Sequence, residues 1–275
     1  PDMLNQGYAI GYAAALCVRN KTSTRAVDIR ALQKHLTDVD CLPAERFDEI
    51  ARETPPVSAA ELDAAAQDPS QRKNLLTLAL GGKRALPALR AAFAKDPTPD
   101  KAKALCLLGD KEGVPLLAQQ VKSLPLPPAE AYAWDGFLKV PELDGAAWCL
   151  AIPRDPRATE VLVERLATCD ASTGFNTLRS ITGALGRIGD PKAAPALAAF
   201  LKKPGVQGHC NDGTDMAGTQ AAQFSKAMIE LFAASALYRC GDCENVGRTV
   251  LAQYLDDWRG IFVRYAGHAL GLKDE

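Results

Sequence analysis

Aromatic residues, long apolar runs and an excess of either charge are all scarce in this sequence. Aromatic side chains make up only 6% of the 275 residues, and their scarcity beside abundant Ala and Leu favours helices over strands. The longest apolar stretch, residues 8–18, is interrupted by Gly11 and is too short to span a bilayer. With 32 basic and 33 acidic residues the net charge is -1, so no global field attracts nucleic acid.

Motifs of familiar enzyme classes are also missing. The sequence contains no Gly-x-Ser-x-Gly elbow, no Walker loop and no His-Glu-x-x-His helix. Basic residues are scattered and form no stripe, which argues further against a nucleic-acid partner. We therefore expect no catalytic residue in this chain, no membrane span and no bound nucleic acid.

What the sequence does contain is a short pattern that returns along the chain. Its clearest copy, residues 184–197, holds a Gly-Asp-Pro corner at Gly189, Asp190 and Pro191, with a second proline at Pro195. Residues 80–89, 107–117, 154–157, 240–243 and 267–271 carry weaker copies, which place the corners at positions 81, 109, 154, 189, 241 and 271.

The corner has a direct physical interpretation. Gly189 can adopt the left-handed conformation that ends a helix, Asp190 can cap the next helix, and Pro191 fits its first turn. Apolar residues fall on one helical stripe on each side of the corner, so each hairpin offers faces that it cannot cover alone. These stripes comprise Ile181, Ala184, Leu185 and Ile188 before the corner, and Ala194, Leu197, Ala198 and Leu201 after it.

This corner resembles the HEAT-like repeat of the phycobilisome-lyase type, over roughly residues 74–272. The resemblance implies an all-α fold, an α-solenoid of HEAT-like helical hairpins preceded by two short non-repeat helices. It also implies a concave face, lined by the second helix of each hairpin, that holds a protein or substrate. Generic hairpin packing without a binding role is the alternative.

Residues 1–40 do not fit the repeat. They contain Gln6 and Gly7 at an expected helix start, an Ala-rich run at 13–15, and Asp28 as a plausible N-cap of a helix with Ile29, Leu32 and Leu36 on one stripe. This stretch resembles the C-terminal end of the flavin domain in a family of FAD-dependent oxidoreductases. The resemblance implies that Gln6 and Gly7 face the flavin of a parent protein.

The Gly-rich turn that seats a dinucleotide is absent from the chain, so we expect no FAD bound to this chain alone. The expected partner is a missing N-terminal flavin domain, and the hypothesis is that this chain is the C-terminal scaffold portion of a longer oxidoreductase. Alternatively, the first helix merely caps an independent adaptor solenoid. A third hypothesis is a lyase-like helper that binds a pigment or another small ligand.

Prolines and loops suggest the domain limits. Residues 1–40 form the flavin-domain remnant, residues 41–57 with Pro55 and Pro56 form a linker, and residues 58–275 form the repeat domain. Ser58 and Glu61 make a capping box at its start. Two insertions, 123–147 and 203–224, interrupt the repeat, and Trp134 and Phe137 in the first are candidate ligand anchors, with core packing as the alternative.

Cysteine and histidine offer one weak candidate for a metal site. His209, Cys210, Cys240 and Cys243 could bind zinc; a disulfide from Cys210 or Cys169 to one of these thiols, or free thiols throughout, are the alternatives. A nucleophilic Cys210 activated by His209 is a further possibility. The eight cysteines are irregularly spaced and do not indicate whether the protein is exported or cytoplasmic. The sequence also places Cys17, Cys106 and Cys149 in apolar helical surroundings, where we expect them to be buried.

Overall fold

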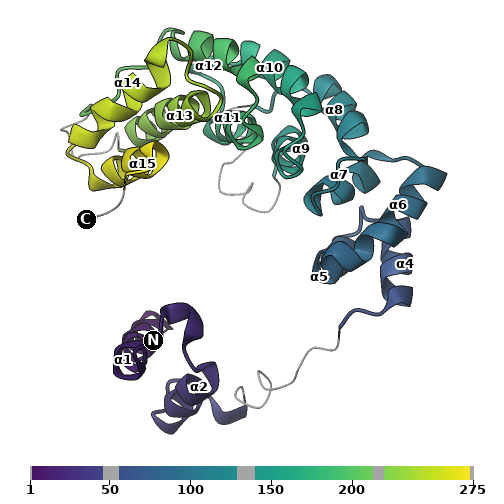
Figure 1. Ribbon diagram of the computed structural model, residues 1–275, viewed down its shortest axis with the longest axis vertical. Helices are drawn as coiled ribbons and strands as arrows, with labels where there is room; N and C mark the ends of the chain where they lie inside the picture. Colours follow the sequence, from purple (N-terminus) through teal and green to yellow (C-terminus); the bar gives the residue numbers. More distant parts are fainter. Residues whose placement is uncertain (1, 46–55, 129–139, 213–219, 273–275) are drawn as a thin grey trace. The chain divides into compact units, whose positions relative to one another are not determined.

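Helices account for every regular element that the computed structural model describes (Figure 1). The described residues are 2–45, 56–128, 140–212 and 220–272. The chain divides into two units, Pro1–Pro56 and Val57–Glu275, and the division falls beside residue 58, where the sequence places the start of the repeats. Within the described ranges, no helix combines the length and the apolar character needed to cross a membrane.

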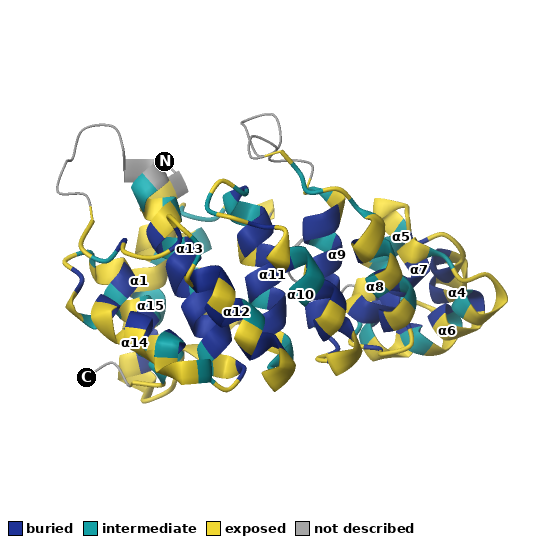
Figure 2. Cartoon of the chain, turned by 90° about the horizontal axis from the view of Figure 1, so that it is seen from above, coloured by how far each residue is buried: buried dark blue, intermediate teal, exposed yellow. Residues whose placement is uncertain are grey.

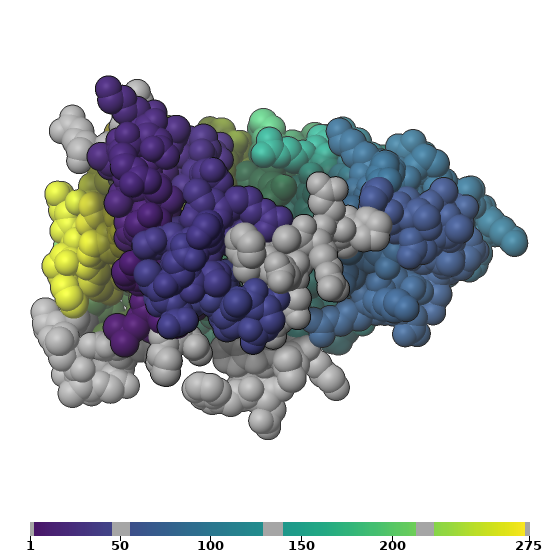
Figure 3. All heavy atoms as spheres, turned by 90° about the horizontal axis from the view of Figure 1, so that it is seen from below, coloured from purple at the N-terminus to yellow at the C-terminus, as the bar shows by residue number. Residues whose placement is uncertain are grey.

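The N-terminal unit consists of two helices that contact each other, α1 (Asp2–Asn20) and α2 (Ile29–Asp38), with a 3-10 turn at Thr24–Ala26. Asp28 caps α2 as predicted, because its carboxylate accepts a hydrogen bond from the Ala31 backbone N–H at 3.0 Å. The rings of Tyr12 and His35 stack between the helices with centroids 3.6 Å apart. The atoms of its described residues 2–45 are drawn in purple to dark blue in Figure 3.

The second unit is a succession of antiparallel helices. Ser58 and Glu61 form the predicted capping box at its start: each backbone N–H donates to the side chain of the other residue. The helices are α4 (Ala59–Gln67), α5 (Arg72–Gly81), α6 (Leu86–Lys95), α7 (Pro99–Leu107), α8 (Val114–Ser123), α9 (Glu142–Ala151), α10 (Thr159–Ala167), α11 (Phe175–Ile188), α12 (Ala194–Leu201), α13 (Gln220–Arg239), α14 (Val246–Gln253) and α15 (Gly260–Leu270).

These helices stack in two layers, as expected for a HEAT-like solenoid. Helices α7, α9, α11, α13 and α15 contact one another in order and form one layer, and α8, α10 and α12 form the other. Within this unit the rows curve, and the layer containing α11 and α13 lies on the inner side (Figure 1). The all-α solenoid fold is thus confirmed.

The prediction that the second helix of each hairpin lines the concave face is wrong. The helix that precedes each corner, such as α11, faces inward, and the helix that follows it, such as α12, lies outside (Figure 1). Close packing within the inner layer accounts for this: a Cβ atom on Gly186 of α11 would lie 2.9 Å from Ala236 Cα of α13. Small residues at this contact let two inner helices approach closely, which fits their place on the inner side of the curve (Figure 1).

The corners have the predicted backbone conformation. Gly189 is left-handed with φ 72°, its N–H donates to Leu185 O, and the Asp190 side chain accepts from the Lys192 N–H at 3.1 Å. Arg154 also has a positive φ, 50°, although it carries a side chain. At the first corner the left-handed residue is Gly82 and not Gly81, because Gly81 is still part of α5 and packs against Leu62.

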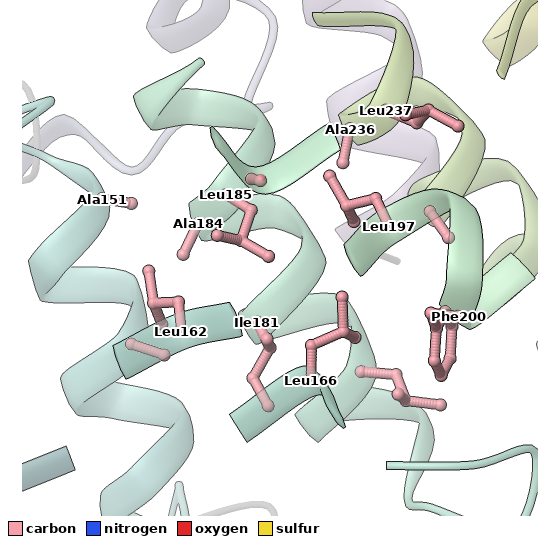
Figure 4. Close-up of a cluster of buried hydrophobic side chains, with 14 of the residues drawn as sticks. Ala151, Leu162, Leu166, Ile181, Ala184, Leu185, Leu197, Phe200, Ala236 and Leu237 are labelled. Atoms are coloured by element: carbon pink, nitrogen blue, oxygen red, sulfur yellow. The ribbon is translucent and has the colours of Figure 1, made fainter. Parts of the chain in front are cut away.

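The core lies between the two layers, where the predicted stripes meet. Leu185 of α11 and Leu197 of α12 are buried, and side chains from α10 and α13 complete the cluster (Figure 4). Buried residues run along the middle of the stacked row (Figure 2). Cys17, Cys106 and Cys149 are buried, as the sequence predicted.

Candidate functional site

The strongest candidate site is a groove of about 700 Å³ on the inner layer of the repeat unit. Helices α9, α11, α13 and α15 each contribute to its walls. Four arginines line it: Arg154, Arg179, Arg187 and Arg239. No acidic side chain does so among the described residues, which gives the groove a positive charge in a chain whose net charge is -1.

The repeat itself brings some of these charges together. Arg187 and Arg239 stand at the same position of successive repeats, two residues before the corner residues Gly189 and Gly241. Each lies in the last turn of its helix, where a cation is stabilised by the helix dipole. Arg154 occupies a corner itself, so the stacking of α9, α11 and α13 brings arginines from three successive corners to the same groove.

Among the described residues, these arginines have no carboxylate partner. Other arginines of the repeat unit do: Arg157 pairs with Asp155, and Arg259 pairs with Asp257 at 2.6 Å. Arg179, Arg187 and Arg239 are exposed. The guanidinium of Arg179 lies 5.8 Å from the Phe232 ring centroid, a cation–π contact that leaves its N–H groups available.

Aromatic rings and glycines form the floor of the groove. Phe232 of α13 packs edge-on against Tyr265 of α15, with ring centroids 5.5 Å apart. Trp148 of α9 is 38% exposed and lies over Gly183 of α11, where an added Cβ would be 3.5 Å from the indole ring. Because Gly183 and Gly186 have no side chains, the groove is open down to the backbone of α11 at these positions. The surrounding aromatic rings offer apolar contact area.

The residues proposed for zinc do not come together. The Cys210 thiol donates to Gln253 O and the Cys240 thiol to Leu185 O, at two different places in the solenoid. The His209 ring nitrogen Nε2 lies 3.0 Å from Gly205 O. In the parts of the chain that the structure describes, no three or more His, Cys, Asp or Glu residues form a group that could hold a metal ion.

All eight cysteines are free thiols in the structure, Cys169 and Cys243 included. Burial and the nearby Asp257 carboxylate raise the pKa of Cys210 to about 11, and burial raises the pKa of Cys240 to about 11. These thiols are protonated near neutral pH, and this disfavours the interpretation of Cys210 as a nucleophile.

The flavin-facing candidates, Gln6 and Gly7, lie on the exposed surface of α1. The expected helix start at these residues is wrong, because α1 already begins at Asp2. Gln6 and Gly7 are in the second turn, beyond the helix-terminal N–H groups that lack an intrahelical partner. The anchor candidates Trp134 and Phe137 lie outside the described residues.

A buried polar network beside the second insertion escaped the sequence analysis. Glu230 is almost fully buried, and its carboxylate accepts hydrogen bonds from the backbone N–H groups of Gly208 and His209 and from the Tyr254 hydroxyl. These donors come from chain segments far apart in sequence, so no local motif announces them. These hydrogen bonds hold residues 208 and 209 against α13. We therefore assign the Glu230 carboxylate a structural role.

Comparison with known proteins supports the repeat. The family model described as PBS lyase HEAT-like repeat matches residues 178–203, which include most of α11, the Gly-Asp-Pro corner and α12. No curated protein and no solved structure gave a significant match to the chain. The match falls on the clearest copy of the repeated pattern. Several of the matched residues in α11 also line the groove.

Proposed function

We propose that the Val57–Glu275 unit is a non-catalytic scaffold that positions a protein partner on its inner layer, with the arginine-lined groove as the contact site. The HEAT-like repeat supports a scaffold or adaptor role. The observation that carries the choice of surface is the group of four arginines that have no carboxylate partner among the described residues, beside the exposed Trp148 and the half-buried rings of Phe232 and Tyr265. Unpaired guanidinium groups and a half-exposed Trp are typical of binding surfaces.

Site-specific crosslinking tests this surface. A photoreactive phenylalanine analogue at Trp148 should form adducts with a defined partner in the native cells. The same analogue at Gln119, exposed on the outer helix α8, should form none. Adducts identified by mass spectrometry only from position 119, or equally from both positions, would overturn the proposal.

A more specific proposal is that this chain belongs to an FAD-dependent oxidoreductase and that residues 1–40 complete its flavin domain. The residue pattern of this stretch supports it, and so does α1, on which apolar side chains such as Met3, Ile10 and Val18 are largely exposed. Exposed apolar faces of this kind favour packing against another folded part.

The parent gene provides the test of the flavin hypothesis. The reading frame upstream of Pro1 should encode a strand, a Gly-x-Gly-x-x-Gly turn and a helix, and the full-length product should show the visible absorbance of bound flavin. A start codon immediately upstream would instead support an independent adaptor. Tetrapyrrole binding by the purified chain in a titration would favour the lyase-like alternative.

A further inference from the structure

We infer that the groove recognises a carboxylate-rich peptide segment of the partner protein; this inference rests on the proposed scaffold function and adds the chemical class of the ligand. Arg154, Arg179, Arg187 and Arg239 line one groove, and none of the other described residues that line it is acidic. A guanidinium group binds a carboxylate through two parallel hydrogen bonds, so a row of them selects a ligand with several carboxylates.

Helix stabilisation alone does not explain all of these charges. Arg187 and Arg239 lie in last helical turns, where the dipole accounts for a cation. Arg179, in contrast, lies in the first half of α11, where the dipole gives a cation no advantage, and its nearest described partner is the ring of Phe232. The charge of the groove thus exceeds what helix capping requires.

The dimensions of the groove favour an extended peptide over a small molecule. Small-molecule sites enclose most of their ligand, but here the guanidinium-bearing residues Arg179, Arg187 and Arg239 are exposed along an open surface. Its walls come from α9, α11, α13 and α15. Neighbouring packed helices lie roughly 10 Å apart, so an extended peptide of about ten residues crosses all four of them.

Aromatic rings suit the apolar side chains that alternate with carboxylates in such a peptide. Trp148 and Tyr265 lie on α9 and α15, on either side of the arginines carried by α11 and α13. Nucleic acid fits less well, because affinity for its backbone comes mainly from many phosphate contacts made by a strongly basic surface. The groove supplies four arginines, and the net charge of the chain is -1.

Fluorescence anisotropy with the purified full chain tests the ligand class. The probe is a labelled peptide of about ten residues in which glutamates alternate with leucine and phenylalanine, and the matched peptide carries glutamine at every glutamate position. We expect the glutamate peptide to bind at least roughly tenfold more tightly, with an affinity that falls as salt is added. Equal affinity of the two peptides would overturn the inference.

Variants connect this binding to the groove. Arg187→Glu together with Arg239→Glu should abolish measurable binding. Arg248→Glu should change it less than about twofold, because Arg248 is exposed on α14, which lies on the outer side of α13 (Figure 1). If this double charge reversal fails to fold, the pair Arg187→Lys and Arg239→Lys replaces it. This pair keeps the positive charges but loses the planar guanidinium groups that bind a carboxylate through two hydrogen bonds, so it should weaken binding roughly threefold to tenfold. Unchanged binding in a folded groove variant would contradict the inference.

Competition distinguishes the other ligand classes. Inorganic phosphate at the same ionic strength as a chloride control should displace no more peptide than chloride does, and a single-stranded oligothymidylate should bind more weakly than the glutamate peptide. The opposite results would assign the groove to small anions or to nucleic acid and would overturn the inference. If Trp148 crosslinks to a partner while the glutamate peptide fails to bind, the scaffold function stands and only the ligand class is wrong.

Discussion

Gly186 of α11 lies directly against Ala236 of α13, where an added Cβ would be 2.9 Å from Ala236 Cα. This contact joins two successive inner helices of the solenoid and lies at the groove. The neighbour is backbone and not a flexible side chain, so it can give way only if the helices separate.

We therefore expect Gly186→Ala to destabilise the repeat unit by about 1–2 kcal/mol, because overpacking outweighs the gain in helix propensity. Gly183→Ala is the matched control three residues earlier in α11. Its Cβ would meet Trp148 at an ordinary 3.5 Å, so it should stabilise the helix by about 0.5–1 kcal/mol. Urea unfolding followed by circular dichroism measures both, and equal effects of the two variants would refute this account of the helix spacing.

The buried carboxylate of Glu230 gives a second prediction. Tyr254→Phe removes the hydroxyl that donates to Glu230 Oε2 at 2.8 Å, and the remaining donors are backbone N–H groups of the insertion. We expect a loss of about 1–3 kcal/mol of unfolding free energy. Tyr238→Phe on α13 is the control, since no described partner binds its hydroxyl. A loss of similar size in the control would show that the hydrogen bond to Glu230 is unimportant.

Acid sensitivity should arise in part from Asp257. Burial alone would raise the pKa of this carboxyl group, but hydrogen bonds from the Arg259 side chain and from backbone N–H groups of Asn211 and Arg259 outweigh it and hold the pKa below its usual 3.8. Because the folded-state pKa is lowered, the stabilisation is present above the unfolded-state pKa. It is lost as the pH falls through that value towards the folded-state pKa.

Asp257→Asn should therefore lower the unfolding free energy at neutral pH by about 1–3 kcal/mol and make it less dependent on pH below about 5. Asp256→Asn, a change at an exposed neighbour, is the control and should change the unfolding free energy at neutral pH by less than about 0.5 kcal/mol. Unfolding curves measured between about pH 7 and pH 3 provide the comparison. An Asp257→Asn profile parallel to that of the native chain would exclude this carboxylate as a source of acid sensitivity.

The thiols should react according to burial. Burial raises the pKa of Cys106 to about 12 and that of Cys149 to about 11, so their reaction with a disulfide reagent at pH near 8 should await global unfolding. The partly exposed Cys41 and Cys243 should react in the native state. Peptide mapping of the modified protein under non-reducing conditions identifies the sites. A bridge from Cys210 or Cys169 to Cys240 or Cys243 would support the disulfide alternative.

Much of the local architecture could be predicted because its causes are local. The corner at Gly189, Asp190 and Pro191 requires only a left-handed residue, a capping carboxylate and a ring that fits the first helical turn. The capping box of Ser58 and the N-cap at Asp28 depend on contacts within three residues. The burial of Leu185 and Leu197 follows from the periodicity of their helices.

The groove was beyond such reasoning, although one signal was present. Superimposing the corner copies would have placed Arg187 and Arg239 at equivalent positions, but nothing local indicates that Trp148 and Tyr265 share a surface with them. The expectation for the concave face failed for the same reason. The direction of curvature depends on how closely the inner helices pack, and the close contact between Gly186 and Ala236 joins helices that are far apart in sequence.

The sequence by itself determined an all-α chain of hairpins with defined corners, because backbone conformation and amphipathic periodicity are properties of short segments. Tertiary structure decided which helices face inward, which arginines share a groove that no described acidic residue lines, and that Cys210 and Cys240 lie apart. These features arise from packing between residues distant in sequence, where the size of one side chain sets the position of a whole helix.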